Sequence, residues 1–188
     1  MRLQGKKIGI FLESDFAEYE IFFYQHFFPS EGADLHFLTR LWDQESITFH
    51  GHELNAPFEC NESFETLDDE ELRSFDALIV PGGMVSDRLR YTEDLEKLPP
   101  AVSVLQRAFA EESIIKGINC HGLWLCSLIP EVVEGRDVVS HVNLLGDVRN
   151  MGAHYVDEDV VVDGDLITGR SAGHCGPVAQ TITHSLSE

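Results

Sequence analysis

The chain has 188 residues, of which 43% are hydrophobic and 24% are charged, and this composition is typical of a globular domain with a sizeable core. Thirteen basic residues against 33 acidic residues give a formal net charge of -20. Such a charge repels nucleic acid phosphates and anionic membrane surfaces, so it argues against both as partners.

The cysteines are few and widely spaced. None of the four forms a CxxC pair, so the sequence indicates neither a disulfide scaffold nor a zinc ribbon. The apolar run at the N-terminus is too short for a signal peptide, and no other run approaches the roughly 18 residues of a membrane helix. We therefore expect a soluble cytoplasmic protein with reduced thiols and no organic cofactor.

Strands and helices are predicted in alternation along the first part of the chain. They are a strand over 6–13, a helix over 14–32 capped by Asp or Ser, a strand over 33–40, a hairpin over 46–60 around Gly51, a short helix over 67–72, a strand over 75–83, a helix over 98–113 and a strand over 114–119.

The second part continues this pattern without a long linker. We expect a helix from about residue 122, a strand over 137–141, a helix over 142–152, a hairpin over 154–170 turning at Asp163-Gly164, and a closing helix over 172–186. The alternation predicts a single α/β domain over residues 1–188, a doubly wound sandwich with a mostly parallel sheet.

The segment INCHGLW places Cys120 directly after a predicted buried strand. In open α/β sheets the ligand crevice lies beyond the carboxyl ends of the strands. A sharp turn there exposes a nucleophile, Gly122 permits a close backbone approach, and the positive end of the following helix favours a thiolate. The alternative is that Cys120 is a small buried hydrophobic residue, as free cysteines usually are.

Four separated motifs resemble, in order, those of the ThiJ/PfpI superfamily. They are DFAEYE in the first β-α loop, DALIVPGGMVSDRLR, GINCHG, and VVVDGDLITGRSAG near the end. The resemblance spans almost the whole chain and is closest to the PfpI branch of intracellular proteases, deglycases and glyoxalases. It implies a flavodoxin-like, class I glutamine amidotransferase-like domain with a nucleophile elbow at Cys120, assembled as a homodimer or homohexamer.

The resemblance also implies roles for individual residues. Cys120 matches the nucleophile, His121 the adjacent histidine, and Glu20 the carboxylic acid that contacts the cysteine. Asp87 falls where hexameric members have an acid that reaches a neighbouring subunit's histidine. His141 falls where many members place a histidine or tyrosine beside the sulfur.

The chemistry of such a site sets further expectations. A developing oxyanion needs backbone donors, and the amides of Gly82 or Gly83 and of His121 are the candidates. Glu20, if buried beside the thiolate, would have a raised pKa and act as a proton donor. The alternative for Glu20 is a solvated position on an amphipathic helix.

Three departures from the family pattern affect these expectations. Leu123 replaces a common proline, a mild change. Ala172 and His174 replace the usual proline and aspartate, which puts substrate contacts there in question, although His141 and His174 are the residues expected to line the substrate pocket. Asp87 replaces glutamate and shortens the reach of the acid by one methylene group.

Another alternative is that Cys120, His141, His174 and Glu20 converge on a transition metal. His50-Gly51-His52 is expected to be a solvated hairpin tip.

The sequence thus predicts a cysteine-dependent hydrolase or lyase that acts on a carbonyl or acyl carbon. Its substrate would be a small 2-oxoaldehyde, the adduct of one with a protein, or a peptide. The alternative is a non-catalytic stress protein that senses oxidants through Cys120. A third possibility is a binding module whose Cys120 is sealed under Trp124.

Overall fold

A computed structural model describes residues 1–188 and contains a seven-stranded sheet in the order β10-β11-β7-β6-β1-β2-β5. All neighbours pair in parallel except β10, which is antiparallel to β11. The strands are β1 (Lys7–Phe11), β2 (Asp34–Thr39), β5 (Glu62–Ser63), β6 (Ala77–Val80), β7 (Ile115–Asn119), β10 (Val160–Asp163) and β11 (Leu166–Gly169). The predicted mostly parallel α/β fold is confirmed.

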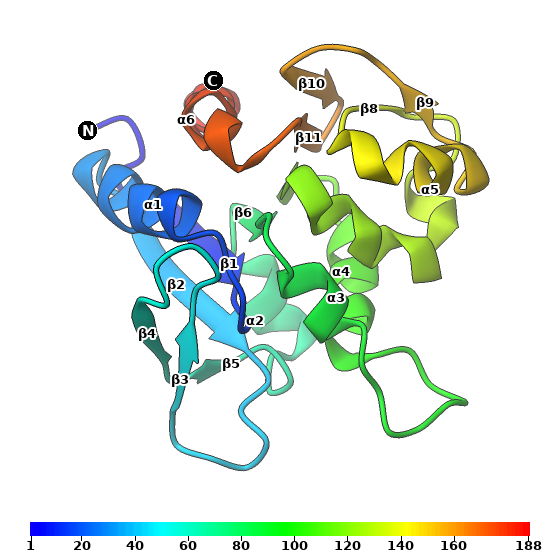
Figure 1. Cartoon of the computed structure of the whole chain (residues 1–188). Helices are drawn as coiled ribbons and strands as arrows, with labels where there is room; N and C mark the ends of the chain where they lie inside the picture. The colour runs from blue at the N-terminus through cyan, green and yellow to red at the C-terminus, as the bar shows by residue number, and fades with distance from the viewer.

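Helices cover both faces of this sheet (Figure 1). They are α1 (Glu18–Ser30), α2 (Asp69–Arg73), α3 (Val85–Leu89), α4 (Pro100–Phe109), α5 (Leu145–Asn150) and α6 (Cys175–Ser185). Helices α1 and α6 lie side by side on one face, and α2 and α4 pack against each other on the opposite face. None of the helices is long and apolar enough to cross a lipid bilayer.

The central strands are buried because they are covered on both faces. Every residue of β6, with the sequence ALIV, is buried, and so are all but the first residue of β1 and of β7. A strand covered on both faces is expected to be apolar along its whole length rather than in alternation. These strands therefore hold the carboxyl ends of β6 and β7 firmly side by side.

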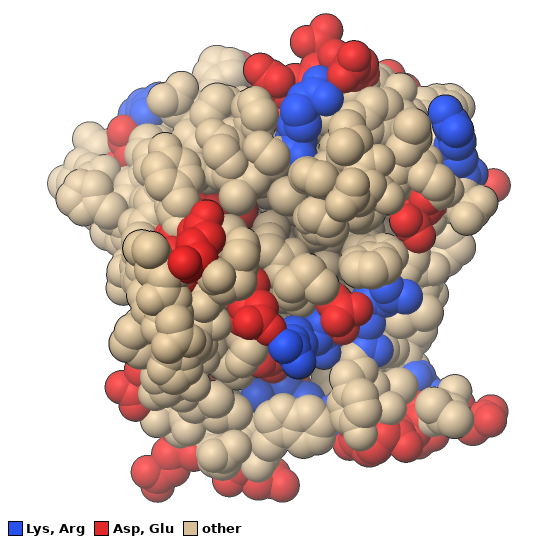
Figure 2. Space-filling model, in the orientation of Figure 1, with Lys and Arg blue, Asp and Glu red and all other residues tan.

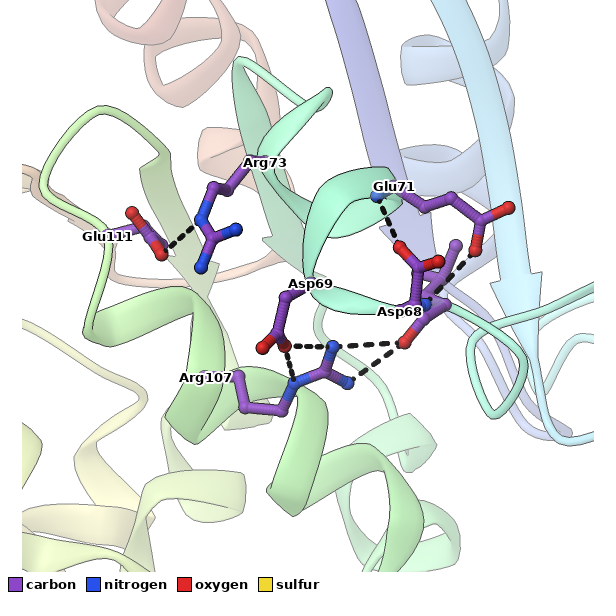
Figure 3. A network of polar contacts seen from close by, with 7 residues as sticks. Asp68, Asp69, Glu71, Arg73, Arg107 and Glu111 are labelled. Carbon is purple, nitrogen blue, oxygen red and sulfur yellow. Dashed lines mark hydrogen bonds and ion pairs between the residues drawn. The ribbon is translucent and has the colours of Figure 1, made fainter.

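Polar contacts join α2 to α4 on the same face of the sheet (Figure 3). Asp68 and Glu71 form a capping box at the start of α2, and this pairing satisfies backbone N–H groups that the helix leaves free. Arg107 of α4 donates to Asp69 at 2.6 Å and to the Leu67 carbonyl at 3.0 Å. The short helix α2 is thus fixed by its cap and by α4 together.

Two small sheets lie outside the main one. Strands β3 (Ile47–His50) and β4 (Pro57–Cys60) form the predicted hairpin. Strand β8 (Asp137–Val138) pairs in parallel with β9 (His154–Tyr155). The hairpin predicted over 154–170 is therefore limited to β10 and β11, which turn at Gly164 with a φ of +58°.

Two helix predictions differ from the structure. Helix α1 begins after Ala17, which makes no side-chain cap, in place of the expected Asp or Ser. The segment after β7 is a 3-10 helix, η1 (Cys120–Leu128), and not an α-helix from residue 122. The helical N-terminus expected beside the sulfur therefore begins at Cys120 itself.

Candidate active site

Cys120 lies at the carboxyl end of β7, where the chain turns into η1. Its φ of +58° is in the left-handed region, which is uncommon for a residue with a side chain and is often found at functional sites. Two residues on, a Cβ on Gly122 would lie 2.5 Å from the Val80 carbonyl oxygen and 2.9 Å from that of Pro81. The absence of a side chain at Gly122 therefore lets this turn pack onto the end of β6.

A pocket of about 520 Å³ opens above Cys120. It is lined by Asp15, Ala17, His52, Glu53, Gly83, Met84, Cys120, His121, His141, Ser171, Ala172 and Gly173. On the face drawn in Figure 2, acidic side chains lie at the margins and also near the middle, where some of them stand beside basic side chains. Cys120 is only 6% exposed, but it is one of the residues that line the pocket.

The groups around the Cys120 sulfur shift the pKa of its thiol in opposite directions. Burial raises the pKa of the Cys120 thiol, and the nearby charge of Glu20 raises it further. The backbone N–H groups of Ala172, His121 and Gly83 lower this pKa, but the net direction is upward. The helix end was expected to favour a thiolate, and the amide donors do act in that direction, but burial has the larger effect on the pKa of this thiol.

Glu20 is completely buried beneath the cysteine, which rules out the solvated position on an amphipathic helix. Its Oε2 accepts a hydrogen bond from the Gly82 N–H at 2.8 Å, and its Oε1 accepts one from Asn119 Nδ2 at 3.0 Å. Burial raises the pKa of Glu20 to about 7, although these donors act in the opposite direction. The Gly82 amide is already paired with Glu20. Of the three amides predicted as oxyanion donors, those of Gly83 and His121 therefore remain.

His121 and His141 stand together on the pocket wall. The Nδ1 atom of His121 is 3.4 Å from the Cys120 sulfur, and the two imidazole rings stack with centroids 4.6 Å apart. Burial, and then His141, lower the pKa of His121, so its imidazole is neutral at neutral pH. A neutral imidazole beside a thiol can accept the thiol proton.

Two expected residues lie elsewhere. Asp87 is exposed on α3 and makes no hydrogen bond or ion pair with His121 of its own chain. His174 was expected to line the pocket, but its imidazole contacts Ser171 Oγ at 2.8 Å and Asp159 at 3.3 Å. No group of three or more His, Cys, Asp or Glu side chains is arranged to hold a metal ion, so the metal alternative lacks a ligand set.

Other residues around the sulfur were not singled out from the sequence. Asn119 could have been singled out from the sequence, because it is a polar residue at the end of a predicted buried strand. Ala172 contributes only a backbone N–H, which no side-chain pattern can indicate. His52, expected at a solvated hairpin tip, lines the pocket. Trp124 does not line it and stacks with the Arg90 guanidinium, 4.8 Å from the ring centre, so it does not seal Cys120.

The architecture and the site together define a doubly wound α/β protein with a cysteine and a buried glutamate at the carboxyl edge of its sheet. The chain belongs to the DJ-1/PfpI family, whose model matches residues 6–183.

Several named proteins are similar to this chain over most of their own length. A protein from Thermococcus kodakarensis named as a deglycase is 29% identical over 168 residues, which cover 89% of this chain and 91% of that protein. Deglycase PfpI from Pyrococcus furiosus is 27% identical over 168 residues, with the same coverage of 89% and 91%. The solved ThiJ/PfpI domain protein from Brachyspira murdochii has a TM-score of 0.79 at 20% identity, covering 97% of this chain and 96% of that one.

Proposed function

We propose that this protein is a cysteine-dependent deglycase that acts on adducts between amines and small 2-oxoaldehydes. The observation that carries the proposal is the placement of Cys120 in the lining of an open pocket, with the His121 imidazole 3.4 Å from its sulfur and Glu20 fully buried nearby. The deglycase names of relatives at 27% and 29% identity support the same reaction class.

The reaction would begin at the carbon that carries the amine. The thiol of Cys120 loses its proton to Glu20 or His121, the sulfur bonds to this carbon, and the amine departs with a proton. Transfer of a proton from this carbon to the adjacent carbonyl carbon, together with transfer of the hydroxyl proton on the first carbon to the oxygen of the second, turns the hemithioacetal into a thioester. Water then cleaves the thioester to give a 2-hydroxy acid and the free thiol. The amides of Gly83, His121 and Ala172 are placed to stabilise negative charge on oxygen during these steps.

The test compares turnover by the wild type and Cys120→Ser. The substrates are methylglyoxal, its adduct with N-acetyl-lysine and an unmodified peptide, and the product measured is the 2-hydroxy acid or the cleaved peptide. We expect wild-type turnover of the adduct and none with Cys120→Ser. Cys60→Ser is the matched control, because Cys60 is a buried thiol that donates to the Phe37 carbonyl and does not line the pocket. Turnover that survives in Cys120→Ser would exclude the mechanism.

A second candidate function is oxidant sensing by the same thiol. The amide donors around the sulfur could also stabilise the oxygens of a sulfenic or sulfinic acid. Mass spectrometry after titration with hydrogen peroxide distinguishes the candidates. Oxidation of Cys120 at low peroxide, together with no turnover of any substrate, would favour the sensor.

A neighbouring subunit could complete the site in a homodimer or homohexamer. Ser86 donates a hydrogen bond of 2.7 Å to the His121 carbonyl, which places α3 beside His121, and Asp87 follows on the exposed side of α3. An Asp87 carboxylate from a second copy would orient the His121 imidazole. Sedimentation of the wild type, together with turnover by Asp87→Asn, tests this arrangement; a monomer with full activity would contradict it.

A further inference from the structure

A second surface depression adjoins the pocket that contains Cys120. It is a groove of about 580 Å³ between the first turns of α1 and the loop that joins β3 to β4, and we call it the α1 groove. The residues that line it are Glu18, Tyr19, Phe22, Phe23, Glu53 and Leu54. Glu53 lines both the α1 groove and the Cys120 pocket, so the two depressions meet at this residue.

The α1 groove exposes large apolar side chains to solvent. Tyr19 is 61% exposed, Leu54 is 81% exposed and Phe22 is 37% exposed. Single exposed apolar residues are ordinary on protein surfaces, whereas several of them in one depression indicate a binding surface. The α1 groove therefore offers an apolar subsite directly beside the pocket in which the reaction is proposed to occur.

The walls of the α1 groove are held in place by the fold. On one side, the Glu18 carboxylate accepts backbone hydrogen bonds from Glu53 and Leu54, each at 2.8 Å. On the other side, the Phe22 ring packs edge-on against the buried Phe16 ring, with the centroids 6.2 Å apart. A surface that is already ordered loses little conformational entropy when a ligand binds. The α1 groove is thus preformed.

Glu53 places a carboxylate at the junction of the two depressions. Its Oε2 accepts a hydrogen bond from the Tyr19 N–H at 3.1 Å, which orients the carboxylate. No basic side chain of the protein pairs with Glu53, whereas Asp15, the other acid in the pocket lining, forms an ion pair with Arg88. A carboxylate that has no counterion in its own chain is complementary to a cation on the ligand.

The features of this surface fit an extended peptide. Adducts of 2-oxoaldehydes form on amines, and most amines of a protein belong to lysine side chains. In an extended peptide, side chains two residues apart point to the same face and are separated by about 7 Å. A modified lysine in the Cys120 pocket can therefore have an apolar side chain two residues away in the α1 groove. The residue between the two then lies beside Glu53.

A second copy of the chain suits the α1 groove less well than such a peptide does. A two-fold interface places the same patch of each copy against the other. Because the charged side chains that line the groove are both acidic, Glu18 and Glu53, this interface would bring like charges together. The net charge of -20 likewise attracts a basic peptide and repels another copy of the chain.

We propose that the α1 groove is a subsite for peptide segments that carry the adduct. The preferred segment has an apolar residue two positions from the modified lysine and a basic residue between them. Tyr19, Phe22 and Leu54 contact the apolar side chain, and Glu53 contacts the cation. The subsite rests on the proposed function, since it assumes that amine adducts react at Cys120, and it adds a preference for the sequence around the amine.

The experiment measures how fast iodoacetylated peptides alkylate Cys120. The probe is acetyl-Gly-Leu-Arg-Lys-Gly-amide with an iodoacetyl group on the lysine amine, and a second probe has the order Lys-Arg-Leu. The Cys120 sulfur displaces iodide, and mass spectrometry measures the modified protein, with Cys120→Ser as the blank. Each rate is divided by the rate of iodoacetamide with the same variant, so that a change in the reactivity of the sulfur cancels.

The peptide sequence should change this normalised rate. We expect leucine to raise it about five- to ten-fold over glycine in one of the two orders, as for a leucine side chain that becomes about half buried. Arginine should raise it about two-fold over glutamine at low salt, because an exposed ion pair is weak and is screened by salt.

Variants assign these preferences to individual side chains. Leu54→Ser should remove most of the preference for leucine, and Glu53→Gln should remove the preference for arginine. Leu95→Ser is the matched control, because Leu95 is 89% exposed but lines neither depression, so both preferences should remain.

Equal rates for the leucine and glycine peptides in both orders would overturn the subsite, as would a preference for leucine that survives in Leu54→Ser. A wild-type dimer that Leu54→Asp converts to monomers in sedimentation would also overturn it, because a second copy would then cover the α1 groove. Alkylation needs no turnover. The predicted preferences in a protein that converts no adduct would therefore support the subsite and contradict the deglycase reaction, and conversion of adducts without these preferences would do the reverse.

Discussion

The imidazole rings of His121 and His141 stack with their centroids 4.6 Å apart and their planes 24° from parallel. A stacked pair of this kind resists protonation of both rings, because the two charges would repel each other. Burial and this neighbour both lower the pKa of His121. His121 is therefore able to act as a base into the mildly acidic range.

Replacing His141 with phenylalanine should raise the pKa of His121. His141→Phe keeps an aromatic ring in the stack but removes the titratable group, while burial continues to lower the pKa. A base works in its neutral form, so the acidic limb of the activity profile should move to higher pH. Titration of the His121 ring protons by NMR measures the change directly. An unchanged His121 titration would show that the stack has no electrostatic role.

Glu18 should be a main reason why the free energy of unfolding falls at acidic pH. Its buried carboxylate accepts backbone hydrogen bonds from Glu53 and Leu54, each at 2.8 Å, and from Ala56 at 3.2 Å. Although burial alone would raise the pKa of Glu18, these donors lower it to about 2 from the usual 4.5. The stabilisation is thus complete above about pH 4.5 and is lost as the pH falls toward 2.

Glu18→Gln should lower the free energy of unfolding by about 1–3 kcal/mol at neutral pH, because a side-chain NH₂ then faces a backbone N–H. Urea denaturation at neutral and at acidic pH measures this, and the difference between wild type and variant should shrink in acid. Glu59→Gln, on the exposed side of β4, is the control. A constant difference at every pH would contradict the assigned pKa.

The sequence was sufficient to predict most strands of the main sheet and insufficient for the strands of two residues. Strand β6, with the sequence ALIV, is a short apolar run, and a run of that kind is typical of a strand covered on both faces. By contrast, β5, β8 and β9 have two residues each, too few to show any period. The 3-10 character of η1 was missed because its apolar residues suit an α-helix equally well.

The site was predictable where function depends on side chains near a recognisable turn. Cys120 and Glu20 could be named from their motifs, and the structure places both at one edge of the sheet. The Ala172 amide could not be named, since every residue but proline has one. His174 was misplaced because the turn before α6 directs Ser171, Ala172 and Gly173 to the pocket and turns the imidazole toward Asp159.

Gly122 should tolerate no side chain. A Cβ there would lie 2.5 Å from the Val80 oxygen, and both strands that meet at this point are buried, so neither can move away cheaply. We expect Gly122→Ala to destabilise the protein by about 1–3 kcal/mol and to slow Cys120 alkylation. Gly146→Ala is the matched control, because it lies in α5 with no atom within 4 Å of the added Cβ. It should be neutral or stabilising by about 0.5–1 kcal/mol; equal melting temperatures for the two variants would contradict the packing argument.

His52 should contribute to substrate binding rather than to chemistry. Its Nδ1 lies 3.2 Å from the Asp15 carbonyl oxygen and 3.1 Å from that of Phe16, so Nδ1 carries the hydrogen and Nε2 is left as an acceptor. The residue lines the pocket beside Glu53, where an acceptor would suit a hydroxyl or amine of the substrate.

His52→Phe should therefore raise KM for an amine adduct by about three- to ten-fold, the loss of one neutral hydrogen bond, with little change in kcat. The rate of Cys120 alkylation should be unaffected, because His52 is not among the groups that act on the sulfur. His52→Gln, which can still present an acceptor, should recover part of the loss. A fall in kcat at constant KM would instead place His52 among the groups that act in the transition state.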